Sequence, residues 1–384
     1  MGGGGEPGIR QLADRERRAG ACAGEARPFA AGGFRFRAGR GRGKLSAVMK
    51  ADAVRPPVRV LIVKLSSLGD LFHALPAVHN LKTGLGARVD WVTQPEYVEL
   101  VRCFTDVERV FAFPRRGWPR GLRPFLAELR RESYDYVIDL QGLLKSALVA
   151  FLARGRRRIG PSYRREGAGW FYTSAAAPRD RRRHAVEQAL EVVGHLRLEP
   201  VGVKFPVKFP ERRLTEPRPR VALLPLSRWA SKNWPLPSFV EVGQRLRQRR
   251  GASMFILGGP ADKDCGVELQ RALGGGAVNL AGKLSLVETG ALLKQMDLVI
   301  ANDSGPIHMA AAVGTPVLAI FGPTDPRRTG PYGPRHRVLT ASLPCQPCFR
   351  RNCRRLGLPC LANVRPEEVL AAAEQMLEAG TAPG

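Results

Sequence analysis

Two short stretches of small polar residues and glycine, about 230 residues apart, carry the residue types best suited to chemistry. Val63–Asp70 ends in a carboxylate, and Val299–His308 contains Asp303, Ser304 and Gly305. Each stretch follows an apolar run typical of a buried parallel strand and precedes a segment predicted to be helical. Helix N-termini offer free N–H groups and a dipole that favours negative charge, so both stretches predict binding sites for anionic groups.

Asp70 follows the first apolar strand, with Ser67 and Gly69 beside it. Open parallel sheets bind ligands at the carboxyl ends of their strands, and a carboxylate there can accept a proton from a substrate hydroxyl as general base. An aspartate at this position is equally typical of a cap on a helix beginning near Leu71. Both interpretations stay open, whereas a lone histidine such as His73 is more typical of packing or surface.

The second stretch ends its strand in Asn302–Pro306, and proline suits the first positions of a helix. The N–H groups of Ser304 and Gly305 are then free to hold a phosphate. We interpret this turn as a clamp for a diphosphate, against the alternative of an ordinary capped turn. His308 either contacts the phosphate or packs, and the local sequence does not decide between these roles.

Lys232 lies in the polar segment Leu226–Pro235, which follows the first apolar strand of the second half of the chain. A lysine ammonium is a compact point charge suited to binding phosphate. A solvated surface cation is the alternative interpretation of a single lysine.

Four of the seven cysteines crowd into one short segment near the C-terminus: Cys345, Cys348, Cys353 and Cys360. Their spacing is compatible with a structural four-thiolate metal site, with two short-range disulfides, or with four reduced thiols in a loop. Nothing nearby indicates an open, catalytic metal, and we expect no cofactor.

Alternating apolar strands and helices predict an α/β fold of parallel βαβ units in two Rossmann-like domains with sheets facing a central cleft. A proline-containing stretch without periodicity separates the two series and predicts a linker. The predicted parts are a disordered basic tail, an N-terminal domain, the linker and a C-terminal domain, at residues 1–55, 56–199, 200–218 and 219–384. The expected strands are 59–63, 88–93, 107–112, 136–140, 220–224, 253–257, 297–301 and 316–321; the expected helices are 71–81, 124–131, 143–153, 237–249, 286–295, 307–313 and 366–377.

The net charge of +27 over 384 residues indicates anionic partners: nucleic acid, a phospholipid surface or a phosphorylated substrate. The glycine- and arginine-rich tail has no apolar region typical of a secretory signal. No apolar run reaches the ~18 residues that a membrane span needs. We therefore expect a cytoplasmic protein that is soluble or peripheral to a membrane.

Four ordered motifs resemble those of the family 9 glycosyltransferases, the lipopolysaccharide heptosyltransferases. They are Val63–Pro76, Tyr134–Ala147, Trp229–Pro235 and Asn302–Ala312, within a resemblance running from about Arg59 to Leu377. The Asp90–Val92 segment and the Gln141–Ser146 run look most like heptosyltransferase I. The cysteine cluster is similar to that of heptosyltransferase II-like members.

The resemblance implies a GT-B fold and an inverting, metal-independent transfer of L-glycero-D-manno-heptose from ADP-heptose. It implies a Kdo or heptose hydroxyl of the lipopolysaccharide inner core as acceptor, carried on lipid A, and peripheral contact with the inner leaflet of the inner membrane.

Carried over residue by residue, the resemblance makes Asp70 the general base and assigns Lys232 to the leaving diphosphate. The implied donor-binding residues are Ser227, Asp262, Asp303, Ser304, Gly305 and His308, with Asp262 on the nucleotide ribose. The implied acceptor-binding residues are Lys64, Ser67, Gly69, Gln141 and Arg165.

Two rival interpretations remain. The first is a family 9 transferase with another sugar or acceptor. The second, argued from charge alone, is a basic nucleic-acid-binding protein, which predicts basic residues interleaved with aromatic ones. That pattern is absent from the sequence outside the tail, so we expect no nucleic-acid partner.

Overall fold

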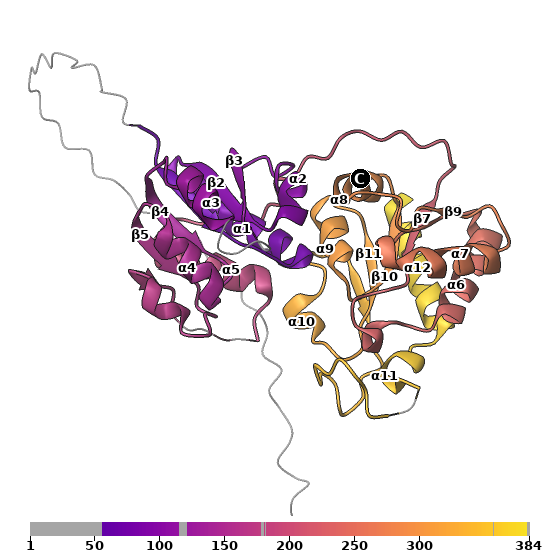
Figure 1. Ribbon diagram of the computed structural model, residues 1–384. Coiled ribbons are helices and arrows are strands. Elements are labelled where there is room, and N and C mark those ends of the chain that lie inside the picture. The colour runs from indigo at the N-terminus through magenta and orange to yellow at the C-terminus, as the bar shows by residue number, and fades with distance from the viewer. Residues whose placement is uncertain (1–55, 115–120, 178–179, 181, 356, 382–384) are drawn as a thin grey trace, which may run out of the picture. The chain divides into compact units, whose positions relative to one another are not determined.

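The computed structural model describes residues 56–114, 121–177, 180, 182–355 and 357–381 (Figure 1). The predicted tail, residues 1–55, lies outside the described residues. Within the described part of the chain, no helix is both long and apolar enough to cross a membrane.

The first half of the chain forms a parallel six-stranded sheet in the order β3-β2-β1-β4-β5-β6. Its central strand β1 is paired with β2 on one side and β4 on the other, and four of its five residues are fully buried. Such near-continuous apolar strands are typical of sheets covered on both faces. The strands are β1 (Arg59–Val63), β2 (Arg88–Thr93), β3 (Arg109–Ala112), β4 (Tyr134–Asp139), β5 (Gly155–Gly160) and β6 (Ser174–Ala175).

The second half forms another parallel six-stranded sheet, in the order β12-β11-β10-β7-β8-β9. Its strands are β7 (Arg220–Leu224), β8 (Ser253–Ile256), β9 (Val278–Asn279), β10 (Leu298–Asn302), β11 (Val317–Ile320) and β12 (Arg337–Leu339). Counted along the chain, both sheets have the doubly-wound order 3-2-1-4-5-6.

The strand order fixes where ligands bind. In doubly-wound sheets the crevice lies outside the carboxyl ends of the strands, where the strand order reverses. That reversal falls between β1 and β4 in the N-terminal sheet and between β7 and β10 in the C-terminal sheet. The turns after these four strands carry nearly all of the candidate site residues.

Helices connect the strands and cover the sheets (Figure 1). In the N-terminal half they are α1 (Leu68–Leu85), α2 (Val98–Val101), α3 (Leu122–Leu129), α4 (Leu144–Leu152) and α5 (Ala185–His195), with short 3-10 turns at η1 (Pro95–Tyr97) and η2 (Ala168–Phe171). In the C-terminal half they are α6 (Leu236–Arg250), α7 (Lys263–Ala272), α8 (Leu286–Leu293), α9 (Gly305–Ala312), α10 (Pro326–Thr329), α11 (Pro359–Ala362) and α12 (Pro366–Thr381), with η3 (Ala230–Lys232) and η4 (Pro260–Asp262).

The expected elements are present, with ends shifted by a few residues, but several others escaped prediction. Strand β5 contains Arg156, Arg157 and Arg158 and does not read as an apolar strand. It forms nevertheless, because it pairs with β4 and the guanidinium of Arg157 stacks 5.6 Å from the ring centre of Tyr136. Helices α5 and α7 and strands β6, β9 and β12 were also missed.

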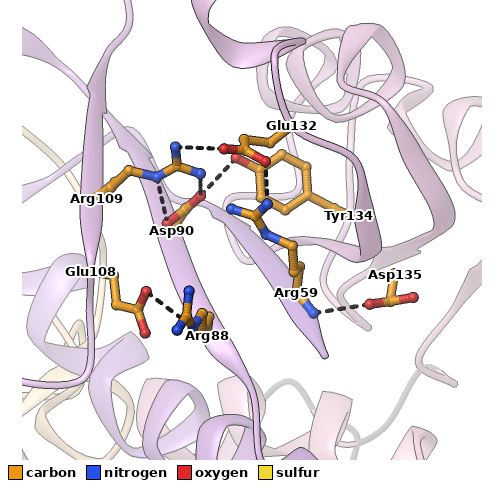
Figure 2. A network of polar contacts seen from close by, with 8 residues as sticks. All are labelled: Arg59, Arg88, Asp90, Glu108, Arg109, Glu132, Tyr134 and Asp135. Carbon is orange, nitrogen blue, oxygen red and sulfur yellow. Dashed lines mark hydrogen bonds and ion pairs between the residues drawn. The ribbon is translucent and has the colours of Figure 1, made fainter. Parts of the chain in front are cut away.

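A polar network ties together the amino ends of the first four strands (Figure 2). The carboxylate of Asp90, 3% exposed, accepts hydrogen bonds from Arg109 at 2.7 and 3.3 Å and from the Tyr134 hydroxyl at 2.8 Å. Arg59 and Arg109 both pair with Glu132. The network lies at the edge opposite the strands' carboxyl ends, so it stabilises the sheet and takes no part in the candidate site.

The segment predicted as a linker is partly packed. Thr105 donates to the carbonyl of Pro206 and Lys208 donates to the carbonyl of Cys103, both at 2.9 Å, and Phe209 is buried. The absence of periodicity in this segment therefore reflects irregular pairing with the N-terminal half, while the exact domain boundaries stay a prediction.

Candidate active site

The turn after β1 presents Asp70 as both a cap and an exposed carboxylate. Its Oδ2 accepts hydrogen bonds from the Ser67 amide at 3.0 Å and the Ser67 hydroxyl at 2.7 Å. The predicted helix start near Leu71 is wrong: α1 begins at Leu68, because Ser67 and Asp70 close the first turn together. The Asp70 side chain is 42% exposed, so it still has lone pairs for a substrate hydroxyl.

The charges around Asp70 keep it ionised. Partial burial raises the pKa of this carboxyl, but Lys64, His73 and the Ser67 amide lower the pKa by more, to well below its ordinary value. The Lys64 ammonium is buried and donates to the carbonyl of Leu140 at 2.8 Å. Lys64 therefore acts on Asp70 from within the protein and is not presented at the surface to an acceptor.

Gln141, which follows β4, holds the neighbouring turn. Its Oε1 accepts hydrogen bonds from the amides of Leu65 and Ser66, both at 3.2 Å. Gln141 is positioned in turn by Asp139, whose Oδ1 accepts from the Gln141 amide at 2.7 Å. The two turns at the strand-order reversal are thus braced against each other.

Asp139 is a positioning residue that sequence reasoning did not single out. Its fully buried carboxylate also accepts from the Gly142 amide and from the hydroxyls of Ser146 and Tyr172, at 3.0, 2.7 and 2.6 Å. Burial raises the pKa of Asp139, and these donors oppose the rise. The sequence signal that could have identified Asp139 was its place at the end of an apolar strand.

Arg165 lies beside the same turn, with an exposed side chain. Its amide donates to the carbonyl of Gly142 at 2.8 Å, and the carboxylate of the next residue, Glu166, accepts from the amide of Leu144 at the start of α4. Gly142 has a φ of +72°, and a Cβ there would lie 2.8 Å from Pro161. These contacts place the backbone of Arg165 near the carboxyl end of β4, with its side chain exposed.

At the carboxyl edge of the C-terminal sheet, Lys232, whose side chain is 16% exposed, and the buried Asp303 form an ion pair at 2.6 Å. The Asp303 carboxylate also accepts a hydrogen bond from the hydroxyl of Thr324 at 2.5 Å. The Lys232 ammonium lies 4.6 Å from the ring centre of Trp229. Lys232 is therefore held in one position and is not the solvated surface cation of the alternative interpretation. Its part in phosphate binding stays a prediction.

The turn after β10 forms the N-terminus of α9. Ser304 is the N-cap and α9 begins at Gly305, so their amides have no acceptor within the helix. The Ser304 hydroxyl is buried and has no hydrogen-bond partner among the described residues. Buried polar atoms are normally paired, so this hydroxyl at a helix N-terminus is a candidate contact for a polar ligand.

The segment that carries Lys232 is attached to β10. Asn302 is fully buried, donates to the carbonyl of Pro225 and accepts from the amide of Trp234 at 3.0 Å. Ser227 contacts Asn233, with its amide at 2.8 Å and its hydroxyl at 2.9 Å from Oδ1. In the structure Ser227 shapes this loop, and Asn302 is a second positioning residue, to which the sequence analysis gave no separate role.

The two turns, distant in sequence, meet where α1 contacts α9. A Cβ on Gly69 would lie 2.4 Å from Cδ2 of His308, and a Cβ on Gly305 would lie 2.9 Å from Cβ of Leu68. The Nε2 of His73 lies 3.1 Å from Nδ1 of His308. Both glycines thus allow close approach of the two helix N-termini, and His308 packs against the first helix.

His184 extends this contact. Its ring lies 5.4 Å from that of His73, and its Nε2 lies 2.9 Å from the carbonyl oxygen of Gly330. Burial lowers the pKa of His184 and lowers that of His308 well below its usual range, so both rings are neutral near pH 7.

Asp262 is the predicted donor-binding residue that has no described contact with the others. It ends η4, after β8, and its Oδ2 accepts from the Gly259 amide at 2.7 Å. It shares the carboxyl edge of the sheet with Lys232 and Ser304, but contacts neither in the described hydrogen bonds and ion pairs.

The four clustered cysteines are free thiols, so the disulfide alternative is wrong. Cys345 and Cys353 are exposed and Cys360 is buried. Within the described residues, no three histidine, cysteine or acidic side chains are placed to hold a metal ion. Among the described residues these thiols therefore lack the arrangement that the possible structural metal site required. Cys360 belongs to the core of the C-terminal half.

A family model described as glycosyltransferase family 9 (heptosyltransferase) matches residues 122–358, more than half of the chain. The chain belongs to glycosyltransferase family 9. The resemblance noted in the sequence is thereby confirmed, and the chain is an enzyme.

Known relatives agree with this assignment. Lipopolysaccharide heptosyltransferase 1 of Pseudomonas aeruginosa is 30% identical over 355 residues, covering 83% of this chain and 98% of the relative. A solved structure of Escherichia coli heptosyltransferase WaaC with ADP-2-deoxy-2-fluoro heptose aligns with a TM-score of 0.67 and 26% identity, over 83% of this chain and 99% of that chain.

The fold prediction is confirmed by the same comparisons. E. coli ADP-heptose lipopolysaccharide heptosyltransferase II aligns with a TM-score of 0.71 at 22% identity, over 85% of this chain and all of that chain. This family 9 chain therefore has the predicted GT-B architecture of two parallel Rossmann-like sheets.

Proposed function

We propose that this family 9 glycosyltransferase transfers L-glycero-D-manno-heptose from ADP-heptose to a Kdo or heptose hydroxyl of the lipopolysaccharide inner core, with inversion. One observation carries the proposal. An exposed carboxylate, Asp70, lies in the first turn of α1, whose N-terminal residues contact the N-terminus of α9. There the hydroxyl of Ser304 has no hydrogen-bond partner among the described residues. A base and an anion-binding turn therefore come from the two sheets to one place.

The proposed chemistry is a single displacement. The acceptor oxygen forms a bond to the anomeric carbon as the bond from that carbon to the diphosphate oxygen breaks. The hydroxyl proton passes to Asp70, and ADP departs with the electron pair. One displacement from the opposite face inverts the configuration and needs no second carboxylate as nucleophile.

The low pKa of Asp70 suits this role. A weakly basic carboxylate does not deprotonate the free acceptor hydroxyl to any useful extent. The hydroxyl becomes strongly acidic, however, as its oxygen bonds to an oxocarbenium-like carbon. Asp70 therefore acts late in the displacement and remains ionised at neutral pH, ready to accept the proton.

The leaving group is stabilised by fixed positive charge. Lys232 and the amides of Ser304 and Gly305 would bind the diphosphate, and electrostatic stabilisation of this kind is often the largest catalytic term. Asp303 holds Lys232 in place. In the proposed scheme Lys232 and these amides stabilise the departing ADP without a divalent cation.

The finer assignments follow the same scheme. Asp262 is proposed to bind the ribose, and Arg165 an acidic group of the acceptor. Ser67, Gly69 and Gln141 shape the acceptor side. The enzyme is proposed to work at the cytoplasmic face of the inner membrane, where lipid A-linked acceptors are anchored.

A donor screen tests the proposal. The purified chain is incubated with a deacylated Kdo-terminated acceptor and ADP-, UDP- or GDP-sugars, and nucleotide release and product mass are measured. We expect release of ADP from ADP-heptose and a product heavier by one heptose. Asp70→Asn should lower kcat by about 10²- to 10⁴-fold with ADP affinity nearly kept.

Matched turnover of the Asp70→Asn variant and the wild type would disprove the assignment of the base. Preference for another sugar nucleotide would replace the heptose assignment with that of another family 9 transferase.

A further inference from the structure

The face formed by α4 and η2 carries an unusual concentration of exposed apolar side chains. Eight large apolar side chains are exposed in the described part of the chain, and four lie on these two elements. They are Leu144, Leu148, Phe151 and Trp170. The three on α4 are spaced four and three residues apart, so they form one stripe along the helix.

Trp170 is the extreme member of this set, with 91% of its surface exposed. Next to it in the chain, Phe171 packs edge-on against Phe151, with ring centres 5.6 Å apart. The tryptophan and the stripe on α4 are therefore parts of one surface, which we call the apolar face. Contiguous exposed apolar surface of this kind marks an interaction site.

Positive charge surrounds the apolar face. Between Gln141 and Trp170 the sequence contains seven lysine and arginine residues and one acidic residue, Glu166. Arg158 lies over the ring of Phe151, with Cζ 5.4 Å from its centre. Arg156 is exposed and lies two residues away on β5, so strand alternation places it on the same side of the sheet as Arg158.

We propose that the apolar face docks on the surface of an anionic lipid bilayer. Apolar and aromatic side chains rimmed by lysine and arginine are the pattern of interfacial membrane binding, because the apolar groups enter the headgroup region and the cations contact anionic lipids. A protein partner would bring acidic groups for specific pairing, whereas this rim of repeated arginines suits a diffuse negative surface.

The position of the apolar face links it to the active site. Leu144, where the stripe begins, has its amide bonded to Glu166, and the neighbouring Arg165 is bonded through its own amide to Gly142. These are the residues beside the proposed acceptor turn. Docking would thus hold the acceptor side of the enzyme at the membrane, and this link rests on the proposed function.

Vesicle sedimentation with the full chain tests the docking surface. The vesicles are phosphatidylcholine alone or phosphatidylcholine containing phosphatidylglycerol. We expect the wild type to bind the anionic vesicles more tightly, and Trp170→Ser and Phe151→Ser each to weaken that binding by about tenfold or more. Arg156→Gln should weaken it by about fivefold. Val267→Ser, on α7 and 40% exposed, is the matched control and should bind as the wild type does.

Unchanged vesicle binding by both Trp170→Ser and Phe151→Ser, with circular dichroism confirming that they are folded, would overturn the proposal. So would a wild type that binds neither vesicle. If Trp170→Ser instead abolishes self-association in analytical ultracentrifugation while vesicle binding persists, the apolar face is a contact between copies and the proposal also fails.

A transfer assay separates this inference from the proposed function. With a soluble deacylated acceptor, Trp170→Ser should turn over as the wild type does, whereas transfer to an acceptor embedded in anionic vesicles should fall. A wild type that binds vesicles through the apolar face but transfers no heptose to the soluble acceptor would contradict the proposed function and leave the docking surface standing.

Discussion

At the scale of single residues, the side chains of the candidate site also stabilise the folded chain. Asp70 caps α1 and still exposes 42% of its side chain. Lys232 is paired with Asp303, which is buried and also bonded to Thr324. A ligand-binding group that is already held in place loses little freedom when the ligand arrives.

The Lys232–Asp303 pair yields a prediction for donor binding. Lys232→Ala should weaken ADP affinity and lower turnover together, each by about tenfold or more, because it removes the fixed cation beside the diphosphate. Asp303→Asn should also weaken ADP binding, because Lys232 loses its anchor. Calorimetric titration of ADP into the single and double variants should give strongly non-additive losses. Additive losses would mean that the two residues act independently.

At the scale of elements, the close contact of α1 with α9 depends on two glycines. Gly69→Ala should lower kcat/KM by about 10- to 100-fold, because its Cβ would overlap His308 and force the two helix N-termini apart. Gly194→Ala in α5 is the control, since a Cβ there meets no atom within 4 Å. Equal kcat/KM values for the two variants would show that the contact has no part in catalysis.

The network at the amino ends of the strands gives a second prediction at this scale. Asp90→Ala should lower the free energy of unfolding by about 2–3 kcal/mol, because it leaves the Tyr134 hydroxyl and part of the Arg109 guanidinium unpaired. Glu108→Ala removes an exposed ion pair with Arg88 and should cost about 0.5 kcal/mol or less. Urea denaturation of both variants measures the difference, and catalytic constants should change little.

At the scale of the whole molecule, buried histidines predict acid sensitivity. Burial lowers the pKa of His184 and His308, and lowers that of His336 to about 4. In the unfolded chain a histidine titrates near pH 6.5, so below that pH the unfolded state binds more protons and the folded state loses stability. Carboxylates with lowered pKa values, such as Asp70, stabilise the folded state above about pH 4, and this stabilisation is lost only as the pH falls below that value.

Unfolding by urea at pH 7, 6 and 5 checks this prediction. The free energy of unfolding should fall by on the order of 2 kcal/mol between pH 7 and 5. His336→Gln should show a shallower fall, because it removes one of the groups that takes up a proton on unfolding. A flat profile across this range would show that the histidines are not buried in their neutral form.

Most of the strands, the longer helices other than α5 and α7, and the two site-bearing turns were predictable, because their signals are local. Apolar runs followed by Asp70 or by Ser304 reveal strands, turns and helix N-termini without knowledge of the rest of the chain. Strand β5 was not predictable, because an arginine-rich strand is stabilised by its neighbours. The helix start at Leu68 was not predictable either, because Ser67 competes with Asp70 as the apparent cap.

The sequence by itself determined the kind of fold and the residue types at its chemical positions, since βαβ alternation and the polar turns are written along the chain. Tertiary structure decided which of those residues act together. The anchoring of Lys232 by Asp303, the bracing of the Leu65 and Ser66 amides by Gln141 and the contact of Gly69 with His308 join residues about 70 to 240 positions apart. No local pattern encodes such contacts, because they exist only once parallel strands have set their order and brought their carboxyl ends to one edge.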